Sequence, residues 1–501
     1  SLHDLRGNYC LTTQATSSFN IQSARRTLSE LYRVKSLDAY GDFQADEIAA
    51  MGALVSYMEL TQAGKMPALK TPRRTDRSET MVIDAVTRAS LEIDQTQRGE
   101  SNGSLLSAID NTVTGPGARQ LGNWLARPLT RIDEIQKRQS AVQYFHDQAD
   151  LREKMRVLLT RAPDMQRASS RLGLGRGGPR DLAALRDGIR LAGELLDLLK
   201  ASTTQSLTAV IMPAPVKQLC TNLHAAPETI GKLYNDLTVA LAADLPLLSR
   251  DGGFIAPGYD NSLDELVGLR DNSRQIVAGL EGEYRQQTDI KSLKIKHNNV
   301  LGYFIETPVA QADKLTHEEP GVFIHRQTLA SAMRFTTVEL SELDAKISRA
   351  RDGAIARELE LFKALSDKAS ECAAEIFVIA EALAELDVFA GLAELASACG
   401  YICPVVDESL AFDITGGRHA VVEQSLRQSS GDENARFIPN NCALASGGQS
   451  RLLLVTGPNM AGKSTFLRQN TLIAILAQIG SFVPATSAHI GVVDRVFSRV
   501  G

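Results

Sequence analysis

The chain has 501 residues, of which 44% are hydrophobic and 23% charged, and its formal net charge is −5. This length is too great for one hydrophobic core, so we expect several domains. The mildly acidic balance excludes nucleic-acid binding through bulk charge, so any such contact must come from local basic patches. No apolar run reaches the roughly 18 residues that a membrane span needs, and we expect no membrane contact.

The cysteines give no sign of a metal site. Six are scattered along the chain, and only Cys399 and Cys403 lie close together. No histidine or second cysteine pair completes a zinc-ligand pattern around them. So few cysteines in so long a chain are typical of a cytoplasmic protein, in which disulfides are rare.

Most of the three hundred residues from Glu79 onward are predicted to be helical. Residues 18–64 predict two helices, and a connector rich in proline, lysine and arginine follows at 66–78. From Glu79 onward the apolar residues recur at helical spacing. Residues 251–260 predict a turn-rich break, and the stretch from Leu263 to Gln287 predicts one charged helix.

A small β insert and a long helical segment come next. β-branched and aromatic residues predict strands around residues 293–305 and 322–324. No proline occurs between Pro320 and Pro404, and the segment from Gln327 to about Ala398 predicts an elongated helical lever. A helix of 40 residues would be about 60 Å long at 1.5 Å per residue. That length suits a connection between two distant sites better than a compact core.

The strongest chemical signal is a phosphate-binding loop. Leu452–Val455 predicts a short buried strand of a parallel sheet, and it leads into a match to the pattern G-x-x-x-x-G-K-[ST]. In such a loop the backbone N–H groups point at phosphate oxygens, Lys463 adds positive charge, and Ser464 offers a hydroxyl to Mg²⁺. The strand before the loop and the helix after it weigh against a glycine turn without a ligand. We expect ATP or ADP to be bound by Gly457, Pro458, Asn459, Met460, Ala461, Gly462, Lys463, Ser464 and Thr465.

Around this loop the chain resembles the MutS family. The resemblance extends from Thr456–Thr465 to Leu467-Arg468-Gln469 and to residues 490–501. Three upstream segments are also similar to the family, and they start at Thr87-Arg88, Asp251-Gly252-Gly253 and Gly417-Arg418-His419. Two departures are Ala420, where the family usually has proline, and Ala461, where it often has glycine. The two pattern glycines, Gly457 and Gly462, are present.

The resemblance implies a multidomain, mostly α fold. We expect an α/β connector remnant at 1–78, a long-helix lever core at 79–255 and 314–398, a small β-containing clamp insert at 256–313, and a partial P-loop α/β ATPase domain at 399–501. No segment resembles the family's N-terminal mismatch-reading domain, whose Phe-x-Glu motif wedges into the duplex. We therefore expect the chain to be a fragment that lacks this domain and the later part of the ATPase domain.

The resemblance also implies a function in DNA mismatch repair. Family members are dimers that clamp duplex DNA, sense mismatches, use ATP with Mg²⁺ and recruit a MutL-type protein. For a bacterial member this implies the cytoplasm, with nucleoid association when DNA is bound. Phe437 and Ile438 match the segment that contacts adenine, although Phe437 could instead be a core residue at a strand start. After Ser464 the only carboxylate is Asp494, which the resemblance places outside a catalytic role, so we expect no catalytic residue in this chain.

Possible DNA contacts are concentrated in the β insert. The resemblance places it at the tip of the clamp, where basic and polar residues fit contacts with phosphates. The alternative is a solvated hairpin with ordinary surface lysines. A second basic concentration, from Arg152 to Arg190, is interpreted as a solvated helical face. Our candidates for DNA binding are Lys294, Lys296, Asn298 and Asn299.

Two other functions remain open. The first is a MutS-like recombination or DNA-junction protein without mismatch recognition. The connector-like segment before Met66 weighs against it, because the recombination-suppressing bacterial branch lacks that domain. The second is an unrelated P-loop protein such as a transporter ATPase. The long helical middle and the Asn459-Met460 pair disfavour it.

Overall fold

The chain folds into two compact, mainly helical units. The computed structural model describes residues 14–62, 66, 69–74, 79–205, 211–298, 300–317, 322–429, 437–444, 451–458 and 461–498. The first unit comprises residues 1–176, 184–234 and 370–501, and the second comprises 177–183 and 235–369. Among the described residues, no helix is both long and apolar enough to cross a membrane. The expected mostly helical, multidomain fold is confirmed, whereas the domain boundaries stay predictions.

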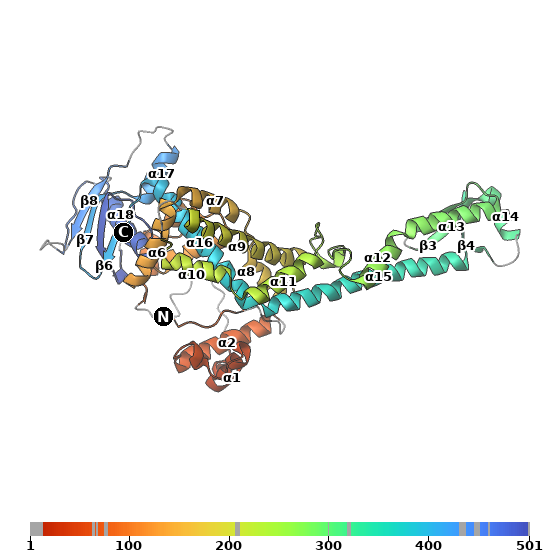
Figure 1. Cartoon of the computed structure of the whole chain (residues 1–501), viewed down its shortest axis with the longest axis horizontal. Coiled ribbons are helices and arrows are strands. Elements are labelled where there is room, and N and C mark those ends of the chain that lie inside the picture. Colours follow the sequence, from red (N-terminus) through yellow and green to blue (C-terminus); the bar gives the residue numbers. More distant parts are fainter. Residues whose placement is uncertain are drawn as a thin grey trace. The chain divides into compact units, whose positions relative to one another are not determined.

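The helical part of the first unit is built around one buried helix, α16 (Ala373–Cys399), which packs against α5, α6, α7, α8 and α10 (Figure 1). A helix that is apolar on all sides is stable only in the interior. Two expected helices in residues 18–64 are confirmed as α1 and α2. Three helices, α9, α11 and α15 (Val338–Glu371), contribute residues to both units. The other elements are η2 (Thr16–Phe19), α1 (Ile21–Tyr32), η3 (Leu37–Tyr40), α2 (Ala45–Thr61), α3 (Ala85–Ser90), α4 (Leu105–Ile109), α5 (Gly115–Ala126), α6 (Ile132–Asp147), α7 (Ala149–Leu159), α8 (Met165–Gly173), α9 (Pro179–Gln205), α10 (Ala214–Leu223) and α11 (Pro227–Ala240).

Asp387 of α16 fixes the start of α5. Its buried carboxylate accepts hydrogen bonds from the N–H groups of Val113 (2.9 Å) and Thr114 (2.8 Å) and from the Thr114 hydroxyl (2.6 Å). The same hydroxyl accepts the N–H of Gly117 (2.9 Å) and so caps the helix. A Cβ at position 117 would lie 2.2 Å from Asp387 Oδ2, so the contact requires glycine. Burial raises the pKa of Asp387, and the three donors oppose that shift by stabilising the charged form.

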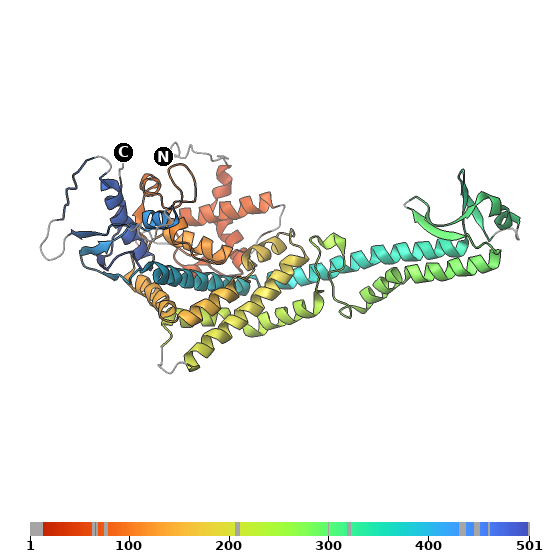
Figure 2. The same ribbon diagram turned by 90° about the horizontal axis from the view of Figure 1, so that it is seen from above.

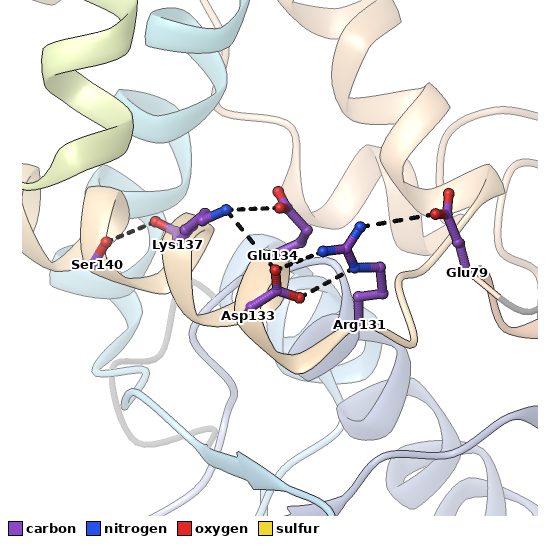
Figure 3. A network of polar contacts seen from close by, with 6 residues as sticks. All are labelled: Glu79, Arg131, Asp133, Glu134, Lys137 and Ser140. Carbon is purple, nitrogen blue, oxygen red and sulfur yellow. Dashed lines mark hydrogen bonds and ion pairs between the residues drawn. The ribbon is translucent and has the colours of Figure 1, made fainter. Parts of the chain in front are cut away.

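A network of exposed ion pairs marks the start of α6 (Figure 3). Arg131 pairs with Asp133 (2.7 Å) and lies 3.8 Å from Glu79, and Lys137 pairs with Glu134 (2.8 Å). The two acids of the first turn also lie where the helix dipole favours negative charge. Exposed pairs of this kind stabilise a fold little. The network therefore contributes little to the stability of the first unit.

Two small sheets complete the first unit. The larger sheet has the strand order β6-β9-β7-β8, with β6 and β9 parallel and the other pairs antiparallel. The smaller sheet pairs β1 with β10 in parallel, which joins segments about 400 residues apart in sequence. Helices α17 (Ala420–Ser429) and α18 (Lys463–Gln478) belong to this region. The strands are β1 (Val82–Ile83), β6 (Val405–Asp407), β7 (Phe412–Gly417), β8 (Asn440–Leu444), β9 (Ser487–Gly491) and β10 (Arg495–Val496).

The second unit is a helix pair that ends in an antiparallel sheet of order β2-β3-β5-β4. Figures 1 and 2 both show α12 and α13 running beside α15, with the sheet at the end of this pair. One face of the sheet packs Ile305 and Phe335 against Leu280 of α13 and Leu340 of α15. The elements are η5 (Ser249–Asp251), α12 (Asn261–Asp271), α13 (Ser273–Thr288), β2 (Lys294–Asn298), β3 (Gly302–Pro308), α14 (Val309–His317), β4 (Ile324–Thr328), β5 (Ala332–Thr336) and α15 (Val338–Glu371).

The expected break at residues 251–260 is confirmed and is tied to α15. The carboxylate of Glu358 accepts the backbone N–H groups of Gly253 (2.8 Å), Phe254 (3.1 Å) and Ile255 (3.3 Å). Glu358 is only 4% exposed, so these donors satisfy a buried charge that would otherwise be costly. The turn is therefore held by the long helix and not by its own sequence alone.

Two expected helices begin or break differently from the prediction. Residues 263–287 form α12 and α13, which are separated at Asn272, and not one helix. Residues 327–336 lie in or between strands β4 and β5, so the expected helix from Gln327 is wrong at its start. Alternate residues of β5 face opposite sides of the sheet, with Phe335 in the core, and this pairing overrides helix propensity. The long helix α15 begins at Val338, and α16 follows after a break at Cys372.

Candidate functional site

The glycine-rich loop before α18 turns at its two pattern glycines. Gly457 and Gly462 have φ angles of 151° and 83°, which glycine adopts without steric cost. Helix α18 begins at Lys463, directly after Gly462. The N–H groups of the first helical turn lack intrahelical partners, and they make the start of α18 suited to anions. Asn459 and Met460 lie outside the described residues.

The Lys463 side chain forms hydrogen bonds with the backbone of its own loop. Its ammonium donates to the carbonyl oxygen of Gly457 and to that of Pro458 (3.0 Å). The N–H of Ala461 also donates to the Pro458 oxygen (3.3 Å). Ser464 follows in the first turn of α18 and is exposed. An anion at the loop would therefore compete with two carbonyl oxygens for the Lys463 ammonium.

A cavity of about 770 Å³ borders the loop. It brings Phe437 and Ile438 together with the loop residues Ala461, Gly462 and Lys463. Ile438 is 81% exposed, and Phe437 is half-buried, so neither is a fully buried core residue. The volume lies within the roughly 300–1,000 Å³ of small-molecule sites. The described lining residues are Leu426, Phe437, Ile438, Asn440, Leu453, Leu454, Val455, Thr456, Ala461, Gly462, Lys463, Thr465 and Phe466, and they do not include Gly457, Pro458 or Ser464.

Several lining residues had not been expected. Thr456 directly precedes the loop pattern, and its position was a signal that could have found it. Leu426 lies in α17, and no local pattern links it to the loop. The side-chain N–H of Asn440 donates to the carbonyl oxygen of Ile438 (3.0 Å). Asn440 thereby orients Ile438, which had been predicted as a site residue. Leu426 and Asn440 therefore reach the cavity through the positions of α17 and β8.

The expected buried strand at Leu452–Val455 is wrong. This segment lies outside the strands that the structure describes, and Leu452 and Leu454 are 80% and 86% exposed. A strand needs hydrogen-bonded neighbours to satisfy its backbone. The described strands of the nearby sheet pair with one another in the order β6-β9-β7-β8, which does not include this segment. The apolar sequence alone therefore does not create the strand.

The far end of α18 is held by Gln478. Its buried side-chain amide donates to the carbonyl oxygens of Leu129 (2.6 Å) and Val493 (2.9 Å), and its oxygen accepts the N–H of Val493 (2.8 Å). Nearer the loop, Arg468 pairs with Glu92 (3.3 Å). The helix that begins at the loop is thus fixed to segments that lie far from it in the sequence.

Arg138 reinforces this end of α18. Its guanidinium carbon lies 3.7 Å from the Trp124 ring centroid, and the group donates to the Ile479 carbonyl (3.2 Å). Burial lowers the pKa of Arg138 to about 10, so the group stays charged at neutral pH. A cation near the last carbonyl groups of a helix interacts favourably with its dipole.

No carboxylate is among the described residues that line the cavity. Asp494 pairs with the neighbouring Arg495 (2.8 Å) beside β10, and its side chain is 70% exposed. Asp494 is not among the described residues that line the cavity. The described lining residues thus include the Lys463 ammonium group, which can pair with an anion, and no carboxylate.

The candidate DNA residues lie on or beside β2 in the second unit. Lys294 is exposed, whereas the Lys296 ammonium pairs with Glu306 of β3 (2.6 Å). The Asn298 side-chain oxygen accepts the N–H groups of Val300 (3.0 Å) and Leu301 (2.7 Å), so Asn298 closes the hairpin turn. Asn299 lies outside the described residues.

The basic segment from Arg152 to Arg190 is not a purely solvated face. Arg152 is 6% exposed and pairs with Glu394 of α16 (2.9 Å). Arg156 donates to the Asn111 carbonyl (2.6 Å), and Arg190 pairs with Glu194. The solvated-face interpretation is therefore wrong for Arg152, which the charge pattern alone could not separate from its exposed neighbours.

Comparison with known proteins gives matches along nearly the whole chain. Family models match at residues 3–70 for MutS domain II, 86–393 for MutS domain III and 453–501 for MutS domain V. A DNA mismatch repair protein MutS of Ruegeria pomeroyi is 48% identical over 492 residues, which are 98% of this chain and 54% of the relative. A protein of the same description from Bartonella henselae is 48% identical over 496 residues, which are 98% of this chain and 53% of the relative.

A mostly helical, multidomain chain with a glycine-rich loop at the start of α18 is thus similar throughout to DNA mismatch repair proteins. The chain belongs to the MutS family. It spans about half the length of the curated relatives that it matches.

Proposed function

We propose that this chain acts in DNA mismatch repair as the nucleotide-binding and DNA-clamping part of a MutS protein. We assign residues 1–78 to a connector, 79–255 and 314–398 to the lever core, 256–313 to the clamp and 399–501 to the ATPase domain. The two relatives are described as DNA mismatch repair proteins. Family membership further suggests a homodimer, a MutL-type partner and a place in the bacterial cytoplasm.

The observation that carries the proposal is the cavity at the start of α18. Loop residues and Phe437 line one volume of about 770 Å³, which is large enough for a mononucleotide. Backbone N–H groups of residues 461–464 and the Lys463 ammonium would hold the phosphates, and Phe437 with Ile438 would contact the base. The Ser464 hydroxyl would be a ligand of Mg²⁺, which neutralises phosphate charge when bound.

Binding would require one rearrangement within the loop. The Lys463 ammonium donates to the carbonyl oxygens of Gly457 and Pro458, and it would leave them for phosphate oxygens. A phosphate oxygen is negatively charged and a carbonyl oxygen is neutral, so the exchange replaces hydrogen bonds from the ammonium to neutral acceptors with hydrogen bonds between two ions. The anchored far end of α18 would keep the helix in place while the lysine moves.

Nucleotide titration of the 501-residue chain tests the proposal. We expect weak binding of Mg-ADP that Lys463→Ala abolishes, whereas Lys217→Ala, an exposed lysine in α10, leaves it unchanged. Phe437→Ala should weaken ADP about five-fold, since stacking contributes about 1 kcal/mol, and should leave tripolyphosphate unaffected. Equal ADP affinity in the wild type and Lys463→Ala would refute the nucleotide site.

The alternative function is that of a recombination or DNA-junction protein without mismatch recognition. The match to MutS domain II at residues 3–70 favours mismatch repair, since the recombination-suppressing bacterial branch lacks the connector. Complementation in a bacterial strain that lacks its mismatch repair protein would separate the two, with this sequence grafted into a full-length relative. Restored mutation avoidance supports repair, and its absence in a stably expressed graft supports the alternative.

A further inference from the structure

One face of the sheet in the second unit carries most of its charge. Successive side chains of a strand point to opposite faces, and the register pairs Lys294 with Glu306 and Glu306 with Arg334. Lys296 and Phe304 are also paired across β2 and β3. We call Lys294, Lys296, Phe304, Glu306 and Arg334 the clamp face. The opposite face of the same strands holds Ile305 and Phe335 in the core.

Glu306 lies at the centre of this face and contacts two of its three cations. One carboxylate oxygen accepts the Lys296 ammonium (2.6 Å), and the other accepts Nε of Arg334 (3.2 Å). The Glu306 side chain is 17% exposed, whereas that of Lys296 is 51% exposed. The hydrogen bond from Lys296, with that from Arg334, lowers the pKa of Glu306, so the carboxylate is charged at neutral pH.

The position of Arg334 does not depend on Glu306 alone. Its guanidinium carbon lies 4.4 Å from the Phe304 ring centroid, and it donates to the Gln327 side-chain oxygen (2.9 Å). Cation–π contact and this hydrogen bond keep the group over Phe304. Glu306 therefore adds little to the placement of Arg334, and its main effect is to neutralise charge.

Lys294 and Lys296 differ in whether an acidic side chain neutralises their charge. Both are exposed lysines of β2 and face the same side of the sheet. Among the ion pairs of the described residues, Lys296 has Glu306 as its partner and Lys294 has none. The two lysines thus form a natural comparison between a compensated and an uncompensated cation.

We propose that Glu306 competes with DNA backbone phosphates for Lys296 and Arg334 and thereby keeps the affinity of the clamp face low. This inference rests on the proposed contact between the second unit and DNA. A carboxylate presents two oxygens to these cations, much as a phosphate does. Where Glu306 holds a cation, phosphate binding exchanges one partner for another and releases fewer counterions. A loose contact of this kind lets a protein move along a duplex.

The first test compares two charge-neutralising variants by fluorescence anisotropy with a matched duplex between 50 and 200 mM salt. Glu306→Gln keeps the side-chain shape, and Glu283→Gln removes one charge from an exposed position of α13. We expect Glu306→Gln to bind about five-fold more tightly at 0.1 M salt, with a salt slope steeper by about one, and Glu283→Gln to match the wild type. Equal gains in both variants, or weaker binding by Glu306→Gln, would overturn the inference.

The second test needs no change at Glu306 and so does not depend on that variant folding. In the wild-type background, Lys294→Gln should weaken DNA binding about five-fold, because an uncompensated phosphate contact is lost. Lys296→Gln should weaken it less than two-fold, because Glu306 already offsets its charge. Equal losses would contradict competition by Glu306.

A third experiment tests the proposed DNA contact independently of the role of Glu306. Joint charge reversal, Lys294→Glu with Lys296→Glu, should weaken binding and flatten the salt slope. If reversal changes neither quantity, the proposed DNA contact fails and the inference fails with it. If reversal weakens binding while Glu306→Gln leaves it unchanged, only the inference about Glu306 fails.

Discussion

At the scale of single residues, the buried imidazole of His419 couples pH to the stability of the first unit. It lies directly before α17, and burial, with a smaller effect of the nearby Arg468 charge, lowers its pKa from 6.5 to about 4. Between these pH values the unfolded chain binds a proton that the folded chain does not. The contribution of the neutral, buried His419 imidazole to the free energy of unfolding is therefore complete above pH 6.5 and is lost as the pH falls toward 4.

We expect His419→Gln to flatten the fall of the thermal unfolding midpoint between pH 6.5 and 4. The exposed His224 is the matched control, and His224→Gln should keep the wild-type pH dependence. Differential scanning calorimetry at several pH values measures both variants. Parallel curves for the wild type and His419→Gln would show that the imidazole is not neutral in the folded state.

At the scale of elements, we expect the second unit to depend on α15 being one continuous helix. It has 34 residues, about 51 Å at 1.5 Å per residue. Ala354 lies in its interior and is buried, whereas Val338 is its first residue and is 59% exposed. The Thr337 hydroxyl accepts the N–H of Leu340 (2.9 Å) and caps the start of the helix. Proline is tolerated at the first helical position and breaks a helix interior.

We expect Ala354→Pro to lower the stability of this unit by about 3 kcal/mol or more, while Val338→Pro leaves it nearly unchanged. Urea unfolding followed by circular dichroism measures both variants. Ala354→Pro should also remove any influence of bound nucleotide on DNA affinity, if α15 carries that influence. A similar small loss in both proline variants would argue against a continuous, structurally required helix.

At the scale of the whole molecule, we expect duplex binding without mismatch preference. The candidate contacts are lysines, which hold phosphates and do not read bases, and the matching family models are those of domains II, III and V. Affinity should fall with a log–log salt slope of about 0.9 for each phosphate neutralised. Titration of matched and mismatched duplexes at one salt concentration measures the preference. Tighter binding to the mismatched duplex would contradict this expectation.

We also expect the 501-residue chain to bind nucleotide without turning it over. No described residue that lines the cavity carries a carboxylate, and Asp494 pairs with Arg495. Hydrolysis by a P-loop protein needs a group that orients the attacking water, whereas phosphate binding does not. Steady-state phosphate release should equal that of Lys463→Ala. Release that depends on Lys463 would reveal a water-activating group outside the lining residues described.

The sequence by itself determined those elements that depend on interactions between residues close together in the chain. The sequence of residues 18–64 predicted two helices, the turn-rich sequence at 251–260 predicted a break, and β-branched and aromatic residues predicted strands β2 and β3. The glycine-rich loop was predicted as a motif because its backbone conformation depends on its own glycines. Family membership followed from the same motifs, although the role of each site residue is still a prediction.

Only the tertiary structure decided features that depend on partners far away in the sequence. Lys296 is compensated because β3 places Glu306 beside it, and Arg152 is buried because α16 supplies Glu394. Leu426 reaches the cavity through the packing of α17, and Leu452–Val455 lies outside the described strands despite its apolar sequence. Charge compensation, burial and strand pairing are set by contacts across the fold, and residue type and spacing do not encode them locally.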